Sequence, residues 1–266
     1  MTRASGGGGR RNLVNTAAED FKPPVFKPND TPRNRLENRL RRFVDLQAGS
    51  AWNDLAGELA AARGRLLDVG CGAQIYRELV PAGCRYTGID TIDARSRFGY
   101  DMPDTHYFEG DDWGVDDEAF DTALCTEVLE HIPDPASFVA RIHRCLRPGG
   151  RLVMTVPFAA RWHFIPFDYW RYTPSGLQQL LGAAGFSDIV VRARGNPVTV
   201  ACYKVMSLII GLLLGAGGGV RGWARRAVGI VLLPVLALLA GIANLSLSRD
   251  WGDDCLGYTV TARRVR

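Results

Sequence analysis

The stretch RLLDVGCG, residues 65–72, decides the fold of this chain. A short apolar run leads to Asp68, and Gly70 and Gly72 follow with Cys71 between them. This pattern predicts a buried strand that ends in a tight turn, because a Cβ at either glycine would obstruct a ligand that approaches the backbone. The turn therefore indicates a nucleotide-like ligand at the carboxyl end of the strand.

Short apolar runs alternate with helical stretches downstream of this motif. We predict strands at residues 65–70, 84–90, 105–110, 120–127, 151–157 and 186–194, and a last strand at 256–263. Helices are predicted between them at residues 75–80, 135–146 and 175–184. The alternation indicates an α/β fold, with a parallel sheet that has helices on both faces. We assign the core domain to residues 64–197, and residues 251–266 supply its final strand.

Upstream of the core, residues 1–30 combine a glycine run with FKPPVFKPND and are expected to form a disordered basic arm. Residues 31–63 are expected to form N-terminal helices. The first starts near Asp30, Thr31 and Pro32, with a capping residue before a proline, and runs to about residue 47. The second is predicted at residues 52–63.

Charge is segregated along the 266 residues, of which 47% are hydrophobic. Residues 1–42 hold 10 basic and 4 acidic side chains, residues 43–191 hold 12 and 21, and residues 192–266 hold 10 and 3. Basic flanks around an acidic core are atypical of a nucleic-acid-binding domain and suit an anionic membrane surface better. The six scattered cysteines show no metal-ligand spacing, so we expect reduced thiols, a cytosolic setting and no metal.

Two apolar segments separate the last two strands. Residues 205–220 and 227–248 carry no charged side chain, and Arg221, Arg225 and Arg226 lie between them. Because both flanking strands join one sheet, the chain must return to the side it left, and two full spans would place these arginines outside. We therefore expect residues 198–250 to form a helical hairpin that contacts membrane lipid through residues 205–248, monotopic at the cytoplasmic face. Two full spans and a buried soluble subdomain are the alternatives.

Acidic residues follow the next two predicted strands. Asp90 ends the strand after the glycine motif, where a carboxylate can accept hydrogen bonds from ribose hydroxyls. Asp111 and Asp112 follow the third strand, where an acid can accept from an adenine amino group and Trp113 can cover the ring. Three such features at successive strand ends indicate a nucleoside site. A dinucleotide dehydrogenase is disfavoured, because its third glycine is here Ile75.

With LLDVGCG, FDTALCTEVLEHIPDP and LRPGGRLVMTVP in this order, the chain resembles the class I S-adenosylmethionine-dependent methyltransferases over residues 43–194 and the final strand. The resemblance implies a Rossmann-like seven-stranded sheet and S-adenosylmethionine as cofactor. One departure is Gln74, which stands where the family often has a third glycine. The resemblance implies that the methionine end of the cofactor lies against Asp68, Gly70, Cys71 and Gly72, and that Asp90 holds the ribose. It places the adenine near Asp111 or Asp112 beside Trp113. The segment that begins with Thr126 and Glu127 would line the methyl-transfer cleft.

A hydroxyl acceptor requires a general base, and histidine has a suitable pKa at neutral pH. His131 and His163 follow the fourth and fifth strands, at the ligand-binding edge of such a sheet, and His163 is our first choice. The aromatic-rich residues after the fifth strand predict either an acceptor pocket or a packed lid with an Asp168–Arg171 ion pair. The candidate acceptor-binding residues are Arg161, Asp168, Tyr169, Arg171 and Tyr172.

The pattern FDYWRYTPSGL resembles methyltransferases of bacterial cell-surface sugar and lipid pathways. The sequence thus predicts a membrane-associated methyltransferase that acts on oxygen of a lipid-linked or cell-surface saccharide acceptor. One alternative is a prenylated quinone or another small lipophilic acceptor. The other is a catalytically idle scaffold that binds the cofactor at the membrane.

Overall fold

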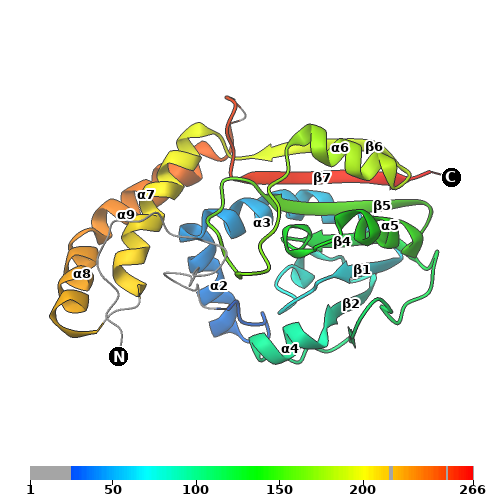
Figure 1. Cartoon of the computed structure of the whole chain (residues 1–266), viewed down its shortest axis with the longest axis horizontal. Helices are drawn as coiled ribbons and strands as arrows, with labels where there is room; N and C mark the ends of the chain where they lie inside the picture. The colour runs from blue at the N-terminus through cyan, green and yellow to red at the C-terminus, as the bar shows by residue number, and fades with distance from the viewer. Residues whose placement is uncertain (1–24, 216–217, 250, 266) are drawn as a thin grey trace, which may run out of the picture.

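A single mixed sheet forms the centre of the molecule in the computed structural model, which describes residues 25–215, 218–249 and 251–265. Within these residues the strand order is β3-β2-β1-β4-β5-β7-β6 (Figure 1). The first five strands are parallel, and β7 is antiparallel to both its neighbours, so the predicted sheet is confirmed but is not wholly parallel. The strands are β1 (Arg65–Val69), β2 (Arg85–Thr91), β3 (Thr105–Phe108), β4 (Phe120–Thr126), β5 (Leu146–Pro157), β6 (Phe186–Arg194) and β7 (Gly257–Arg264).

Helices cover both faces of the sheet. On one face α5 (Pro135–Cys145) and α6 (Pro174–Ala183) pack over a cluster that includes Leu67 and Met154. On the other face α3 (Leu46–Leu59) packs over Leu66, Leu124 and Val153. Adjacent strand residues such as Leu66 and Leu67 thus enter opposite cores, as the two-residue repeat of a strand requires. Figure 1 shows α5 and α6 in front of the sheet and α3 behind it.

The first N-terminal helix begins where predicted, with a capping residue before Pro32, but it ends earlier, and the second helix begins earlier than predicted. The first, α2 (Pro32–Val44), is capped by Thr31, whose side chain accepts from Asn34 N, and it stops at Asp45. Asp45 in turn caps α3, so the second helix begins earlier than expected. Gly49 lets the two helices approach closely, because a Cβ there would lie 2.4 Å from the carbonyl oxygen of Arg42. The predicted arm at residues 1–30 lies outside the described residues except for 25–30.

The predicted helix at residues 75–80 is wrong. This segment holds only the short 3-10 helix η1 (Arg77–Leu79), preceded by Gln74 with a positive φ of 52°. The Gln74 side chain donates to the carbonyl oxygen of Pro103 (2.7 Å) and to Thr105 Oγ1 (2.8 Å). These bonds hold a backbone conformation that interrupts a helix at this position. A short α4 (Ile92–Phe98), which was not predicted, follows β2.

Among the described residues, three helices separate β6 from β7 and project to one side of the sheet (Figure 1). We call α7 (Pro197–Leu214), α8 (Gly219–Val231) and α9 (Leu233–Ser246) the apolar arm. The predicted two-helix hairpin with arginines at its turn is wrong in this detail, because Arg221, Arg225 and Arg226 lie within α8. Helix α7 ends at Leu214 and α8 begins at Gly219, so the three arginines fall inside the second helix of the arm, where arginine is a favourable residue.

The apolar arm packs against the core through a hydrophobic cluster of its own. Val200, Met206 and Leu236 contact Leu46 and Leu256 in a separate hydrophobic cluster. By length and composition α7 is apolar enough to cross a membrane, and α8 with α9 would form a second such segment, bent by 50°. Only 28% of the apolar window of α7 is buried in the protein.

Candidate active site

The glycine-rich loop after β1 lies against the segment after β4. Gly70 and Gly72 have positive φ angles of 70° and 52°. A Cβ on Gly70 would lie 2.5 Å from Val128 Cγ2, so only glycine allows this approach. The amides of Gly70 and Cys71 both donate to the carbonyl oxygen of Ile89, which fixes the loop to the end of β2. Cys71 itself is buried, with its Sγ 3.7 Å from Thr105 Oγ1.

Asp90 joins this loop to the segment after β2. Its Oδ2 accepts from the amide of Gly72 (2.9 Å) and from the Tyr100 hydroxyl (3.3 Å), and its Oδ1 accepts from Thr91 N (2.8 Å). Burial raises the pKa of this carboxyl above its ordinary value. A carboxylate has about four acceptor positions, so Asp90 keeps capacity for a further donor.

Asp68 is buried beneath the same loop. Its Oδ2 accepts from the Tyr86 hydroxyl at 2.7 Å, whereas its Oδ1 has no hydrogen-bond partner among the described residues. Burial raises the pKa of this carboxyl to about 7. An unpartnered buried oxygen is costly, and a donor from a ligand would relieve that cost.

The residues after β3 separate into exposed and buried side chains. Asp111 and Asp112 are exposed, and Asp112 lies 3.7 Å from the Arg141 guanidinium. Trp113 is buried, with its ring against Phe108 and Phe138. The two acids are therefore accessible to a ligand, whereas Trp113 packs in the core under α5.

Thr126 ends β4 and Glu127 follows it with a positive φ of 52°. The Glu127 carboxylate accepts from Nη2 of Arg194 at 2.6 Å. Arg194 is 1% exposed and also donates to the carbonyl oxygens of Gln47 and Val156. Sequence reasoning missed Arg194 because it ends β6, far along the chain, and nothing local marks it as a partner of Glu127.

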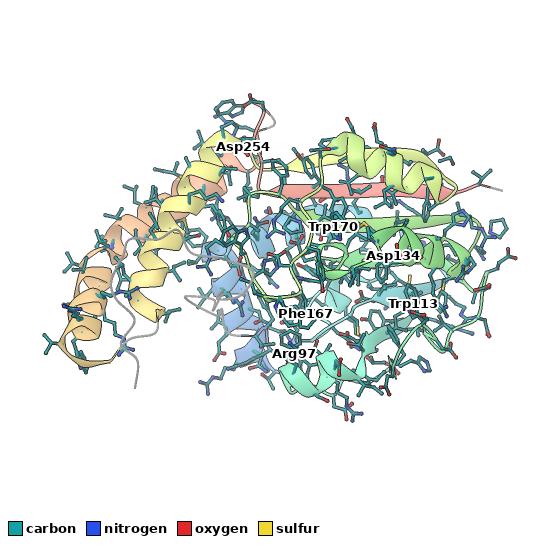
Figure 2. All side chains as sticks on the ribbon, in the orientation of Figure 1. Arg97, Trp113, Asp134, Phe167, Trp170 and Asp254 are labelled. Atoms are coloured by element: carbon teal, nitrogen blue, oxygen red, sulfur yellow. The ribbon has the colours of Figure 1, made fainter. Side chains whose placement is uncertain are left out.

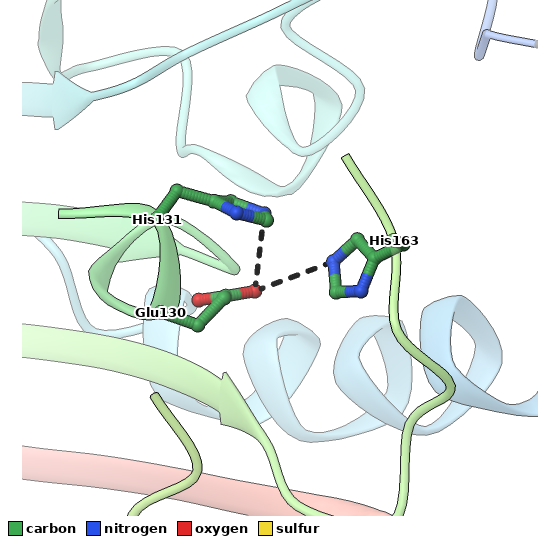
Figure 3. A group of neighbouring side chains, drawn as sticks. All are labelled: Glu130, His131 and His163. Carbon is green, nitrogen blue, oxygen red and sulfur yellow. Dashed lines mark ion pairs between the residues drawn. The ribbon is translucent and has the colours of Figure 1, made fainter. Parts of the chain in front are cut away.

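Three polar side chains converge beyond β4 and β5. Glu130 and His131 lie in the 3-10 helix η2 (Leu129–His131), and His163 comes from the segment after β5. Glu130 Oε1 lies 3.7 Å from His131 Nε2 and 3.9 Å from His163 Nε2 (Figure 3). One ligand atom from each residue lies within 4.8 Å of the others, which is close enough to hold a metal ion or to share a proton. The sequence spacing did not predict this cluster.

The hydrogen bonds of the two imidazoles assign their tautomers. His131 Nδ1 lies 2.8 Å from the carbonyl oxygen of Phe167, and His163 Nδ1 lies 3.0 Å from that of Arg161. Because a carbonyl only accepts, each Nδ1 carries the hydrogen and each neutral ring presents a lone pair at Nε2. Burial lowers the pKa of His131, which favours its neutral form.

Glu130 completes the cluster as a fully buried carboxyl, and neither of its oxygens has a hydrogen-bond partner among the described residues. Burial and the neighbouring Glu127 raise its pKa well above the ordinary value. Burial therefore favours a protonated Glu130 carboxyl beside a neutral His131 imidazole.

The aromatic segment after β5 folds over this cluster. The amides of Tyr169 and Trp170 donate to the carbonyl oxygen of Glu130, and the Tyr172 hydroxyl donates to that of Leu129. The structure thus brings the predicted acceptor-binding segment to the two histidines. Trp162, Tyr169 and Trp170 keep exposed side chains at its outer surface.

An ion pair within this segment involves two of the predicted residues. Arg171 donates from Nη1 to Asp168 Oδ1 (2.6 Å) and from Nη2 to Oδ2 (2.8 Å). Burial raises the pKa of Asp168, but the hydrogen bonds from Arg171 lower it by more, so the pKa lies below its ordinary value. Arg171 also donates to the carbonyl oxygen of Arg161. For these two residues the structure favours the packed lid over the acceptor pocket, because each charged group already has the other as its partner.

Helix α4 closes the cluster from the side of the nucleoside site. Phe98 contacts Phe164 with ring centroids 5.4 Å apart, and Phe164 contacts His131 at 5.3 Å. The Arg97 guanidinium lies 5.0 Å from the centroid of Phe167, and Figure 2 shows these two side chains together. An apolar wall thus connects the loop of Asp90 to the histidines.

These features fit the cofactor that the sequence resemblance implies. Gly70 lets Val128 pack against the loop, Gly72 leaves space beside the backbone, where the nearest atom to an added Cβ is the Tyr100 hydroxyl oxygen at 3.6 Å, and Asp68 offers an unpartnered oxygen for a cationic group. Asp90 retains acceptor capacity for the ribose hydroxyls, and the exposed Asp111 or Asp112 can accept from the adenine amino group.

Similarity to known proteins covers the same part of the chain. Residues 35–191 match the family described as methyltransferase domain. A ubiquinone biosynthesis O-methyltransferase of Aromatoleum aromaticum is 36% identical over 110 residues, which cover 38% of this chain and 46% of that protein. One from Paracidovorax citrulli is 38% identical over 103 residues, 35% of this chain and 43% of that protein. The matches span less than half the length of these two relatives.

Solved structures are more distant. A phosphoethanolamine N-methyltransferase of Haemonchus contortus, crystallised with S-adenosylhomocysteine, is 15% identical with a TM-score of 0.47, covering 81% of this chain and 53% of that one. A Thermotoga maritima protein described as a SAM-dependent methyltransferase is 14% identical with a TM-score of 0.49, covering 86% and 97%. The match over most of the sheet, together with the strand order, places the chain in the methyltransferase domain family, as a class I S-adenosylmethionine-dependent methyltransferase.

Proposed function

We propose that this protein methylates a phenolic hydroxyl on a small lipophilic acceptor of the prenylated-quinone type. The observation that carries the proposal is the convergence of His131, His163 and Glu130 under an aromatic segment, with both imidazole lone pairs directed away from the backbone. The relatives named for ubiquinone biosynthesis support this acceptor rather than the saccharide that the sequence alone favoured.

The acceptor needs a base because a phenolic hydroxyl, with an ordinary pKa of about 10, stays protonated at neutral pH. S-adenosylmethionine supplies the methyl group as a carbon bonded to a sulfonium. As the acceptor oxygen bonds to this carbon and the carbon–sulfur bond breaks, Nε2 of His163 takes the hydroxyl proton. His163 is the better-placed base, because 33% of its side chain is exposed against 19% for His131.

The surroundings of the base suit an apolar acceptor. Phe164 contacts His131 directly, and Trp162, Tyr169 and Trp170 offer exposed aromatic surface around the segment. Aromatic walls exclude water and bind a planar ring, which aligns the acceptor for in-line transfer.

The proposal includes association of the apolar arm with the cytoplasmic face of a membrane, where a prenylated acceptor dissolves. The support is exposed apolar surface: Leu208 in α7 is 72% exposed and Leu238 in α9 is 64% exposed. Replacing both residues by glutamate should abolish flotation of the full-length protein with lipid vesicles without unfolding it, because neither side chain is buried. Unchanged flotation would contradict the arm's role.

The acceptor is tested with the full-length protein and S-adenosylmethionine carrying a labelled methyl group. One reaction contains a prenylated catechol and another contains cell-envelope glycans, and mass spectrometry identifies the methylated atom. We expect label on a phenolic oxygen. His163→Gln should lower kcat at least a hundredfold while calorimetry shows unchanged cofactor affinity, because only the proton acceptor is lost.

The matched control is His106→Gln, which alters an exposed histidine on β3 and should leave kcat unchanged. Label found only in the glycan fraction would refute the acceptor. Cofactor binding without transfer to either acceptor would instead support the idle scaffold.

A further inference from the structure

A groove lies between the N-terminal helices and the apolar arm, away from the histidine cluster. It has a volume of about 560 Å³ and is lined by α2, α3 and Asn244 of α9. Asn244 Nδ2 donates to the carbonyl oxygen of Phe43 at 2.8 Å, so the arm is held to α2 at one end of the groove.

Two guanidinium groups line this groove, and neither lies within ion-pair distance of a carboxylate in the part of the chain that the structure describes. Arg39 and Arg42 are three residues apart on α2 and therefore share a face. Neither forms an ion pair or hydrogen bond with a side chain among the described residues, whereas the nearby Arg41 is paired with Asp45. The Arg42 guanidinium lies 3.5 Å from the ring centroid of Trp52, which holds its charge in place.

Apolar side chains line the same groove. Leu36 is 57% exposed, Leu40 is 62% exposed and Phe43 is 47% exposed, and their spacing places them along one stripe of α2. A soluble phosphate would neutralise the arginines but leave this stripe in water. A ligand that has both a phosphate and a hydrocarbon chain would cover both.

We propose that this groove binds one anionic phospholipid, with its phosphate between Arg39 and Arg42 and a chain along Leu36, Leu40 and Phe43. The basic helix complements the anionic headgroup, and the groove adjoins the exposed apolar arm at α9. The proposal rests on the proposed membrane association, but not on the identity of the methyl acceptor. It makes α2 a recognition element for lipid charge, beside an arm that binds lipid chains.

Vesicle flotation of the full-length protein tests the proposal, with neutral phosphatidylcholine alone or mixed with phosphatidylglycerol. The wild type should prefer the mixed vesicles. Replacing both groove arginines, Arg39→Gln and Arg42→Gln, should reduce this preference at least tenfold while leaving affinity for neutral vesicles unchanged. Circular dichroism and thermal unfolding verify that the variant folds.

The matched control removes the same charge from the same helix outside the groove, with Arg33→Gln and Arg35→Gln, and should change the preference less than threefold. If both double variants lost the preference for anionic vesicles equally, general attraction to basic charge would explain the binding, and the proposed lipid site in the groove would be wrong. Equal binding of wild type to both vesicles would overturn it as well, while absence of binding to any vesicle would refute the membrane association itself.

A photoreactive phosphatidylglycerol analogue provides a direct readout. Mass spectrometry should find the label on the peptide that contains residues 36–53, and soluble glycerol phosphate should not compete. Labelling confined to α7–α9, or full competition by millimolar glycerol phosphate, would overturn a lipid site here.

Discussion

The stability of the folded protein should depend on pH through Asp68, a buried carboxyl of the proposed cofactor site. This carboxyl is 2% exposed at the end of β1, and only one of its oxygens has a partner among the described residues, the Tyr86 hydroxyl. Burial raises its pKa from an ordinary value of 3.8 to about 7. The folded protein thus retains a proton on Asp68 that the unfolded chain releases at much lower pH.

The sign and size of the effect follow from this difference. The stability contributed by the protonated form is complete below pH 3.8 and is lost as the pH rises through about 7. At about 1.4 kcal/mol per unit of pKa, the whole loss is about 4 kcal/mol, of which roughly 2 to 3 kcal/mol falls between pH 5 and pH 8.

The variant Asp68→Asn keeps the shape of the side chain and cannot ionise. Urea unfolding of the cofactor-free proteins at pH 5 and pH 8 should show that the free-energy difference between variant and wild type widens by roughly 2 to 3 kcal/mol in favour of the variant. Other buried carboxyls, such as Glu130, titrate in both proteins and cancel. A difference that stays constant between the two pH values would refute the reasoning.

The same variant should bind the cofactor more weakly at pH 8, although it gains stability relative to the wild type between pH 5 and pH 8. An ionised Asp68 can accept a charge-assisted hydrogen bond from a cationic ligand group, whereas the amide of asparagine offers a weaker acceptor. Calorimetry at pH 8 should therefore show at least a tenfold loss of affinity. Equal affinity of variant and wild type would place Asp68 outside the cofactor site.

Three further variants test other contacts. Asp90→Ala should weaken S-adenosylmethionine binding at least tenfold in calorimetry, because it removes the proposed ribose acceptor; unchanged affinity would contradict that role. Arg194→Met should lower the free energy of unfolding by about 3 to 5 kcal/mol in urea, since it breaks a buried ion pair, whereas the exposed Arg192→Met should cost less than about 1 kcal/mol. Gly70→Ala should abolish cofactor binding or folding, as followed by calorimetry and circular dichroism, because its Cβ would collide with Val128 in the segment after β4. The control Gly83→Ala places its Cβ in open space. A Gly70→Ala protein that folds and binds normally would show that the loop can shift.

Elements that depend on local pattern were predicted well from the sequence. The sixth strand was predicted at residues 186–194 and is β6 (Phe186–Arg194), and the strand before the glycine motif is β1. In both strands apolar residues recur along the run and a glycine follows it, so the sequence itself marks where the strand ends. Where long-range bonds compete with propensity, as for Gln74 and residues 75–80, prediction failed, because the side-chain partners of Gln74 come from the approach to β3.

The candidate site shows the same division. Asp68, Gly70 and Asp90 were found because strand ends of a parallel sheet meet at one edge, whatever the loops between them do. Arg194 was missed, because its partner Glu127 becomes its neighbour only when β6 joins the sheet through β7.

The sequence by itself determined the strands, the glycine turn and the acids at the strand ends, because these follow from the periodicity and conformational preferences of neighbouring residues. Tertiary structure alone decided that His163 lies beside Glu130 and His131, and that Asn244 of the apolar arm lies beside Phe43 of α2. Such contacts join segments far apart in the chain, so they depend on how the aromatic segment and the arm pack against the finished sheet.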